Sequence, residues 1–400
     1  MRRIGHISLL VLLLVAAGRC QDDLADYPIK EEQCENFGEC LTECVKKLPP
    51  NRQFTEILDC SDACAVTHCK EVVVDDPTLG LGSTSKPPSF GGKKAPPSFG
   101  SNAPPNQQWG GQAGAASVQP ALDENLLPGG GPNEMQKTSV GTMMFNPKDM
   151  PVGRSIDKYG EYGRDELELL KQVIRKGDVI VDAGSMYGHT ALGLRSVVGD
   201  EGAIYAFEPQ RILHQILCSN FAINGAFNCH CRQTKQEALG QKGGEIVVPA
   251  LDIEQEGCHG CTALDAANYL GETVKMTTVD DLNLPKLRLL KADVEGMEID
   301  IVKGAVKTIQ YAMFKPALYV RAHYNPEDNT LSLKTQELAR FIKGLNYDMY
   351  WHFVRLYYED NFYSNAENEF GEDTVLYILA VPHVEGSSIE GLDPVEVPPL

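Results

Sequence analysis

The chain has 400 residues, 42% of them hydrophobic, which is enough for two or three folded units with substantial cores. Acidic residues outnumber basic ones 55 to 36, so the formal net charge is −19. No run of Lys and Arg offsets this charge. The composition therefore argues against nucleic acid as a partner, because its phosphates would be repelled.

The first 20 residues are expected to be a signal peptide. Arg2 and Arg3 precede an apolar stretch, Ile7 to Gly18, in the layout typical of secretory leaders. This stretch is shorter than the roughly 20 apolar residues that a membrane span needs, and no later segment is apolar for long enough. The twelve cysteines suit an oxidising compartment. We therefore expect a secreted or luminal protein with no stable membrane span after cleavage; the alternative is an uncleaved anchor.

Residues 21–75 form a cysteine-rich segment, for which we predict a helical hairpin. Its six cysteines are Cys34, Cys40, Cys44, Cys60, Cys64 and Cys69. Two pairs are spaced four residues apart, which places both thiols of a pair on one helix face, and Pro49 and Pro50 interrupt the helix between them. Nested bridges Cys40–Cys64 and Cys44–Cys60, with Cys34–Cys69 as a third, are the simplest of about fifteen pairings. Zinc ligation is the weaker alternative.

Residues 76–137 are predicted to be a disordered linker, since Gly, Pro, Ser, Asn and Gln dominate them and a motif at Lys86 (KPPSFGG) recurs imperfectly at Ala95 (APPSFGS). Residues 384–400 are predicted to be a solvated acidic tail.

Residues 138–383 alternate strand-like and helix-like stretches. Strands are expected at 178–184, 203–209, 287–294, 317–324 and 374–381, and helices at 164–176, 189–199, 211–225 and 298–309. Apolar strands that alternate with helices predict an α/β domain, with a mostly parallel, doubly wound sheet covered on both faces.

Ligands of such sheets bind beyond the carboxyl ends of the strands. The turn after the first strand contains Gly184 and Gly188, but Met186 stands where a dinucleotide fingerprint requires glycine. Glu208 ends the next strand and can accept both hydroxyls of a ribose. These features predict a nucleoside without a pyrophosphate cradle. S-adenosylmethionine fits, and Asp182 suits its sulfonium and ammonium charges; the alternative is a turn that serves chain packing alone.

The segments VIVDAGSMYGHTALGL, IYAFEPQ, CSNFAING and LLKADVEGMEIDIVKGA, in this order, resemble the FkbM family of S-adenosylmethionine-dependent methyltransferases. The resemblance covers roughly Glu166 to Val381. It implies the seven-stranded class I methyltransferase fold and S-adenosylmethionine as the cofactor. Met186 departs from the family, many of whose members have Asn there.

Methyl transfer to oxygen needs a base close to the acceptor hydroxyl. Asp293, Glu295 and His323 follow neighbouring strands and are the predicted catalytic residues. The alternative for Glu295 is that it begins a helix, where the helix dipole favours an acid. Asn224, with Asn220, either contacts the adenosine or caps its own helix.

Four further cysteines, Cys229, Cys231, Cys258 and Cys261, enclose His230 and His259. Disulfides are favoured over zinc in the secretory pathway, so no metal site is predicted and Cys218 is left as a buried thiol.

Two functions compete. The first is an O-methyltransferase acting on a sugar or another hydroxylated small molecule. The second is a secreted, non-catalytic binding or matrix module that retains the fold. The acidic residues Asp182, Glu208, Asp293 and Glu295 favour the enzyme.

Overall fold

The computed structural model describes residues 131–231, 236–261, 271–284, 286–311, 315–325, 330–384, 389 and 391–396, together with 43–44 and 47. The expected signal peptide and nearly all of the expected hairpin and linker lie outside these residues. Cys44 is described and is disulfide-bonded, as a stapled hairpin requires, but the predicted pairings lie outside the described residues. None of the helices in the described ranges is long and apolar enough to cross a membrane.

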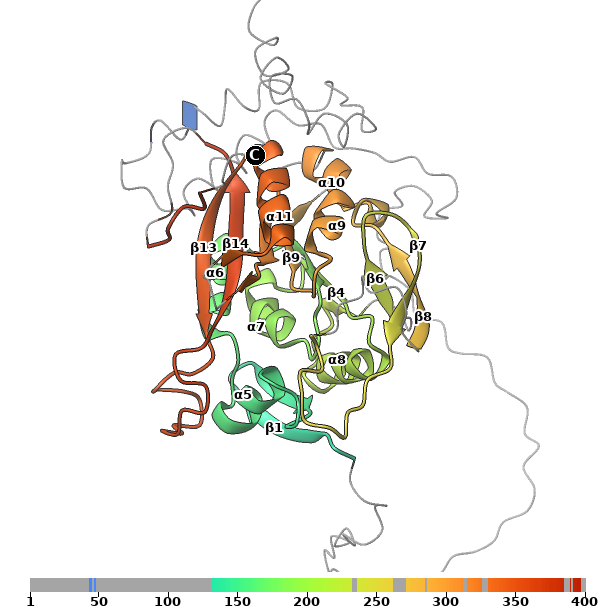
Figure 1. Ribbon diagram of the computed structural model, residues 1–400, viewed down its shortest axis with the longest axis vertical. Coiled ribbons are helices and arrows are strands. Elements are labelled where there is room, and N and C mark those ends of the chain that lie inside the picture. Colours follow the sequence, from blue (N-terminus) through green and yellow to red (C-terminus); the bar gives the residue numbers. More distant parts are fainter. Residues whose placement is uncertain are drawn as a thin grey trace, which may run out of the picture. The chain divides into compact units, whose positions relative to one another are not determined.

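A seven-stranded sheet forms the centre of the domain (Figure 1). In spatial order its strands are β13 (Tyr347–Arg355), β14 (Thr374–Pro382), β10 (Ala317–Arg321), β9 (Leu287–Ala292), β3 (Val179–Ala183), β4 (Ala203–Phe207) and β5 (Cys229–His230). The five strands from β10 to β5 run parallel, and β14 runs antiparallel to both of its neighbours. The order reverses at the β3–β9 pair, which confirms the doubly wound sheet and places the ligand-binding edge beyond these two strands.

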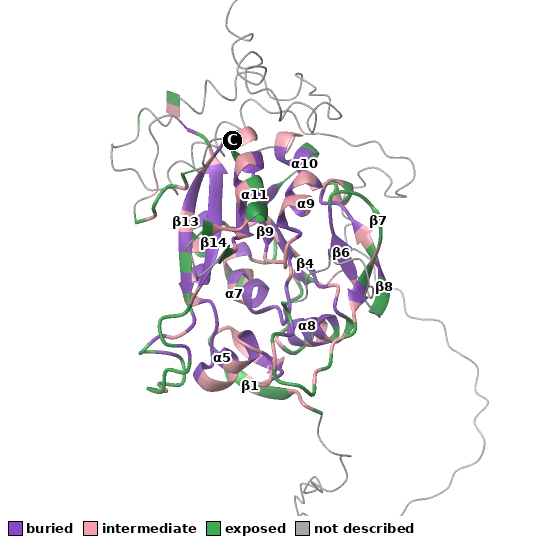
Figure 2. Cartoon of the chain, viewed as in Figure 1, coloured by how far each residue is buried: buried purple, intermediate pink, exposed green. Residues whose placement is uncertain are grey.

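Helices cover both faces of the sheet, because successive strand residues point to opposite sides. Ile180 and Leu289 face one apolar cluster, and Val181 and Leu290 face the other. The first cluster includes residues of α5 (Val152–Tyr159), α6 (Arg164–Val173), α7 (His189–Val198) and α8 (Arg211–Ile223). The second includes residues of α9 (Glu298–Lys303), α10 (Val306–Tyr311) and α11 (Leu333–Gly344). Figure 2 shows the central strands as the most continuously buried part of the domain.

The helix expected at 298–309 is two helices, α9 and α10. The side chain of Asp280, from the short 3-10 helix η2 (Asp280–Leu282), accepts hydrogen bonds from the backbone N–H groups of Lys307 (3.1 Å) and Thr308 (2.7 Å). A distant carboxylate therefore caps a new helix where the apolar periodicity suggested continuation.

The folded domain begins before residue 138, where we expected it to begin. β1 (Glu134–Thr138) pairs with β2 (Gly141–Phe145), so residues 134–137 are a strand and not linker. Asn220 of α8 and Asn224, which follows the last residue of α8, hold this hairpin by accepting the N–H groups of Met144 (2.7 Å) and Thr142 (3.0 Å) and donating to the carbonyls of the same residues. A separate three-stranded sheet contains β6 (Glu237–Leu239), β8 (Gly271–Thr277) and β7 (Gly244–Pro249), and β11 (Tyr324–Asn325) pairs with β12 (Thr330–Leu331).

The expected solvated tail is also wrong for residues 391–396. The N–H of Trp351 donates to the carbonyl of Asp393, and the N–H of Val395 donates to that of Met349, both at 2.8 Å. Leu392 and Val395 pack against the two apolar clusters. The exposed backbone of the edge strand β13 thus gains a partner, which a sequence rich in acids and prolines did not indicate.

The cysteines of the domain form disulfides, as expected, but the cysteine that remains free is not Cys218. Cys218 pairs with Cys231, and Cys258 pairs with Cys261. Cys229 is the buried free thiol among the described cysteines. The reason is spatial: Cys218 on α8 lies next to the segment after β5, whereas Cys229 points into the core beneath α7.

Candidate active site

The turn between β3 and α7 satisfies its own backbone donors. Gly184 and Ser185 donate their N–H groups to the carbonyl of Phe207, and Gly188 donates to that of Ser185. The N–H of Met186 donates to Glu208. These four N–H groups are therefore not available to a ligand phosphate.

The two glycines of this turn allow close packing. A Cβ on Gly184, whose φ is 79°, would collide with the carbonyl oxygen of Asp293. A Cβ on Gly188, whose φ is 81°, would collide with Leu217 and Phe221 of α8. Gly184 thus brings the turns after β3 and β9 together beside the pocket, whereas Gly188 faces the core and is not among the pocket residues.

Glu208 follows β4 and is buried. Its Oε2 accepts the N–H of Met186 at 3.0 Å, and its Oε1 accepts the N–H of Gln210 at 2.8 Å. Burial raises the pKa of Glu208 to about 7, although these two hydrogen bonds oppose the shift. Each oxygen retains a second lone pair, so the carboxylate can still accept two hydroxyls of a ligand.

Asp182 precedes the pocket residue Ala183 on β3 and is part of a buried ion pair. Its Oδ1 is 3.2 Å from Nζ of Lys291, its register partner on β9. Burial would lower the pKa of Lys291, but Asp182, Glu166 and Asp293 together raise it above its ordinary value. We had not expected Lys291 to take part in the site, although a lysine within a buried, mostly apolar strand was a visible signal.

Asp293 follows β9 and is held by three neighbours. The hydroxyl of Tyr377 donates to Oδ2 at 2.6 Å, while Lys291 Nζ lies 3.6 Å from Oδ2 and Arg321 Nη1 lies 3.6 Å from Oδ1. Burial favours the neutral acid, but the two cations and the hydrogen bond from Tyr377 together hold the pKa of Asp293 below its usual value. A carboxylate with a depressed pKa is a weak base.

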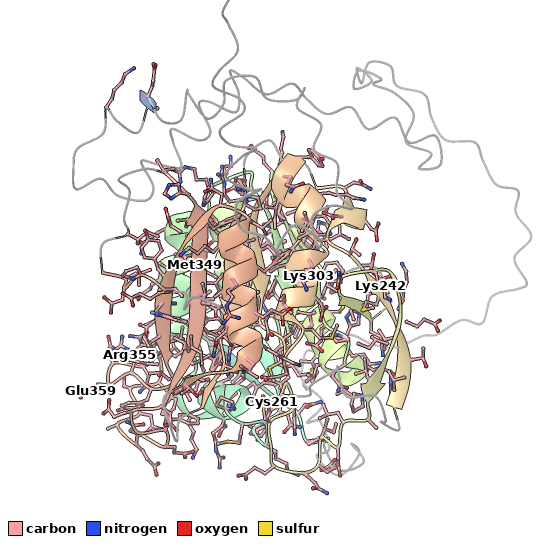
Figure 3. The ribbon with its side chains drawn as sticks, turned by 45° about the horizontal axis from the view of Figure 1, so that its top comes forward. Lys242, Cys261, Lys303, Met349, Arg355 and Glu359 are labelled. Atoms are coloured by element: carbon pink, nitrogen blue, oxygen red, sulfur yellow. A yellow bond between two sulfur atoms is a disulfide. The ribbon has the colours of Figure 1, made fainter. Side chains whose placement is uncertain are left out.

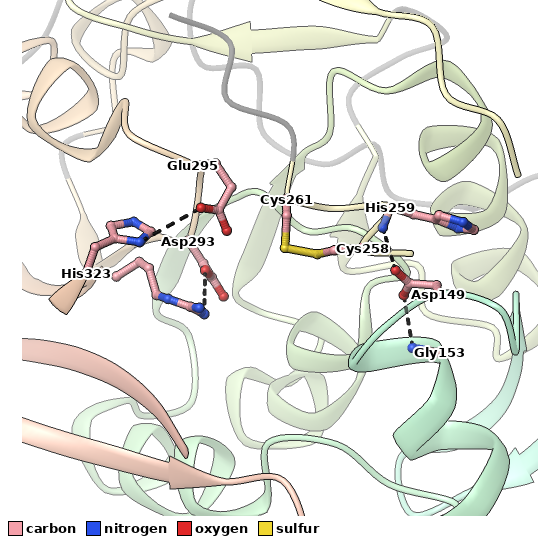
Figure 4. Close-up of a disulfide and its surroundings, with 9 residues drawn as sticks. Asp149, Gly153, Cys258, His259, Cys261, Asp293, Glu295 and His323 are labelled. Atoms are coloured by element: carbon pink, nitrogen blue, oxygen red, sulfur yellow. Dashed lines mark hydrogen bonds and ion pairs between the residues drawn. A yellow bond between two sulfur atoms is a disulfide. The ribbon is translucent and has the colours of Figure 1, made fainter. Parts of the chain in front are cut away.

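Glu295, His323 and Glu298 form a second group at the same edge of the sheet. The imidazole of His323 lies between two carboxylates, with Nδ1 3.9 Å from Glu295 Oε2 and Nε2 3.2 Å from Glu298 Oε1. Hydrogen bonding to Glu298 is the largest cause that raises the pKa of His323, and burial raises that of Glu295. Figure 4 shows His323 and Glu295 beside Asp293.

One pocket collects several of these groups. It is lined by Ala183, Gly184, Phe207, Glu208, Pro209, Gln210, Glu237, Ala238, Leu239, Gly260, Asp293, Val294, Glu295, Met297 and Ile301. Of the predicted site residues, Gly184, Glu208, Asp293 and Glu295 line it, and His323 lies next to Glu295. Asp182, Gly188 and Asn224 do not line it. Asn224 instead bonds to the backbone of β2, so its expected role at the cofactor is replaced by a structural one.

A disulfide-closed loop, residues 257–261, borders this pocket through Gly260. Gly260 lies against the side chain of Met186, whose backbone has a φ of 49°. The buried carboxylate of Asp149 accepts the N–H of His259 at 2.8 Å and the N–H of Gly153 at 2.9 Å. The loop is therefore anchored to the start of α5, between Asp149 and the Glu295–His323 pair (Figure 4).

Opening this loop should weaken cofactor binding. In the double variant Cys258→Ser/Cys261→Ser we expect stability to fall by about 2 kcal/mol. Closing the loop on a ligand would then require ordering of at least one more residue, at about 1–2 kcal/mol, so affinity for S-adenosylmethionine should fall about tenfold. Calorimetry measures this. The control is Cys218→Ser/Cys231→Ser, which removes a disulfide that does not border the pocket. Equal losses of affinity in the two double variants would contradict the prediction that the Cys258–Cys261 loop borders the cofactor site.

The strand order β13-β14-β10-β9-β3-β4-β5, with β14 reversed, defines the class I S-adenosylmethionine-dependent methyltransferase fold. The cofactor of this class is S-adenosylmethionine. More specifically, residues 182–359 match the model of the methyltransferase FkbM domain.

The chain is similar to the hexuronic acid methyltransferase AglP of Haloferax volcanii, with 26% identity over 201 residues, or 49% of this chain and 77% of the relative. Among solved structures it is similar to the methyltransferase FkbM of Methylobacillus flagellatus, with 19% identity and a TM-score of 0.34, over 56% of this chain and 51% of that one. It is also similar to an S-adenosylmethionine-dependent O-methyltransferase of Thermotoga maritima, with 13% identity and a TM-score of 0.32, over 63% and 79%. The chain thus spans about half of the M. flagellatus protein.

Proposed function

We propose that the domain transfers a methyl group from S-adenosylmethionine to a hydroxyl oxygen of a sugar. One observation carries the proposal: Glu208, suited to a ribose, and Glu295, with His323 beside it, border the same pocket from the ends of different strands. The bound cofactor would supply a methyl group on a sulfonium and leave as a neutral thioether. The rest of the chemistry belongs to side chains of this chain.

The residues present fit the cofactor. Glu208 would accept the ribose hydroxyls, and Phe207, Pro209 and Leu239 offer apolar surface to the adenine. On the other side, Glu295 would orient the acceptor and His323 would take its proton as the oxygen bonds to carbon. Asp293 remains in the proposal as a fixed negative charge that holds Arg321, because its depressed pKa suits it poorly to act as the base.

We infer a uronic acid sugar as the acceptor to test first. The similarity to a hexuronic acid methyltransferase supports this choice. Arg321 places positive charge at the same edge of the sheet, where a sugar carboxylate can be recognised. The two disulfides of the domain support action in the secretory pathway. That nucleic acid is not a partner remains a prediction from the net charge.

The test combines binding and turnover. Calorimetry should show S-adenosylmethionine binding to the purified protein, and labelled methyl should pass to a hexuronic acid oligosaccharide more readily than to its neutral counterpart. Mild alkali then distinguishes products, since methyl esters are hydrolysed and methyl ethers survive. A carboxylate acceptor has no proton to lose, so an ester product would contradict the proposed base. Binding without transfer to any hydroxylated acceptor would favour the non-catalytic module.

His323→Gln and Glu295→Gln should each lower methyl transfer by about 100-fold or more and leave cofactor affinity within about threefold, because His323 would take the proton of the acceptor and Glu295 would orient the acceptor, and neither would contact the cofactor. Initial rates with labelled cofactor and calorimetry measure the two quantities. A matched loss of cofactor affinity would instead place these residues in the cofactor pocket.

A further inference from the structure

We propose that Glu298 is a positioning residue for methyl transfer: its buried carboxylate holds His323 so that Nδ1 faces the acceptor. This inference rests on the proposed function and adds a residue to which neither the sequence motif nor the comparisons assign a role. It belongs to the same pocket edge but acts through the imidazole and not on the substrate.

The contact is short and protected from solvent. Glu298 Oε1 lies 3.2 Å from His323 Nε2, and the Glu298 side chain is only 5% exposed. The same oxygen accepts the N–H of Gly296 at 3.3 Å, which fixes the carboxylate at the start of α9. A carboxylate in this position favours hydrogen on Nε2, so the neutral imidazole keeps its lone pair on Nδ1.

The backbone of His323 is also held. Its N–H donates to Oγ1 of Thr335 at 2.9 Å, and the Thr335 hydroxyl donates back to the His323 carbonyl at 3.1 Å. The Ser332 N–H donates to the same carbonyl at 2.9 Å. Backbone and ring are thus fixed by α11 and α9 separately, which leaves Nδ1 directed toward Glu295. At 3.9 Å this carboxylate is too distant to hydrogen-bond to Nδ1.

Several charged groups of the described residues surround the ring. Glu298 lies on α9, Glu295 in the turn before it and Arg321 at the end of β10, while Lys334 of α11 donates to the Gly296 carbonyl at 3.3 Å. Glu298 raises the pKa of His323 most, Glu295 adds to this, and burial and Arg321 oppose it. Removing the Glu298 charge should therefore lower the pKa. In the reaction the acceptor O–H bond breaks, its electron pair stays on oxygen, and the proton bonds to Nδ1.

The test compares Glu298→Gln with the wild-type chain. NMR titration of the histidine ring, assigned with His323→Gln, should show the His323 pKa lowered in the variant. The acidic limb of the kcat profile should move to lower pH with it, because the base must be unprotonated to act. We expect kcat at the plateau to fall about tenfold and KM to change little. Glu298→Asp retains the charge, so its His323 pKa and its kcat should lie between those of the wild type and Glu298→Gln.

Glu337→Gln is the matched control. Glu337 Oε1 is 3.6 Å from Nζ of Lys303, and its side chain is 62% exposed on the outer helix layer where Figure 3 labels Lys303. This variant removes the same charge and should leave the His323 pKa and the pH profile unchanged.

An unchanged His323 pKa in a folded Glu298→Gln variant overturns the proposal. If that variant does not fold, Glu298→Asp takes its place, and an unchanged pKa there has the same meaning. A second outcome is also informative. If the His323 pKa falls in Glu298→Gln, but the wild-type protein binds cofactor and methylates no acceptor, then the proposed function is wrong. The role of Glu298 in catalysis is then wrong as well, although its contact with His323 is confirmed. The NMR result thus separates the two failures.

Discussion

Lys291→Met is expected to lower the free energy of unfolding by about 3–5 kcal/mol, the usual cost of removing one partner of a buried ion pair. Lys291 is 2% exposed and Asp182 is 1% exposed, so neither can exchange its partner for water. Without the ammonium group, Asp182, Asp293 and Glu166 would share one buried region with less compensating charge. Urea denaturation at pH 7 measures the loss.

Two comparisons make this result interpretable. Lys176→Met removes a lysine 3.1 Å from Glu201, where both side chains are about 70% exposed, and should cost less than about 1 kcal/mol. Asp182→Asn/Lys291→Met removes both charges of the buried pair and should recover most of the loss, because no carboxylate is then left unpaired at Asp182. A single-variant loss as small as that of Lys176→Met would show that the pair is not important for stability.

Glu208→Gln is expected to weaken S-adenosylmethionine binding about tenfold to 100-fold at pH 8. The amide removes the charge that would accept the ribose hydroxyls, and a hydrogen bond to a charged group contributes about 1.5–3 kcal/mol. Because burial raises the pKa of Glu208 to about 7, wild-type affinity should rise between pH 6 and pH 8, and the variant should lack this rise. Calorimetry at several pH values gives both results.

The free energy of unfolding of the cofactor-free protein should fall with rising pH, whereas its affinity for the cofactor should rise. A carboxyl whose pKa is raised by folding contributes stability that is present below its ordinary pKa and is lost as the pH rises through about 7. Between pH 5 and pH 8 the wild-type chain should therefore lose stability relative to Glu208→Gln. Glu272→Gln, which removes an exposed carboxylate 2.6 Å from Arg211, is the control. Parallel pH profiles of affinity for the wild type and Glu208→Gln would show that Glu208 does not contact the ligand.

The sequence by itself determined the α/β class, the main strands and the two acidic ends that border the pocket. Local patterns are sufficient there: Val179–Ala183 and Leu287–Ala292 are short, mostly apolar stretches typical of buried strands, and the polar residues that follow them must lie at one edge of a parallel sheet. The order of Gly184, Glu208, Asp293 and Glu295 along the chain was therefore enough to place them together.

Only the tertiary structure decided what each polar group contacts. Asp182 was expected at the cofactor, but strand register places it against Lys291, 109 positions away. Asn224 was expected near the adenosine, but it bonds to a hairpin 82 residues earlier in the chain. Three further contacts also join residues that are distant in the sequence. The side chain of Asp280 caps α10, Cys218 pairs with Cys231, and Glu298 bonds to His323. Burial makes each polar group take whichever partner the packing brings within hydrogen-bonding distance, and periodicity along the chain carries no information about that distance.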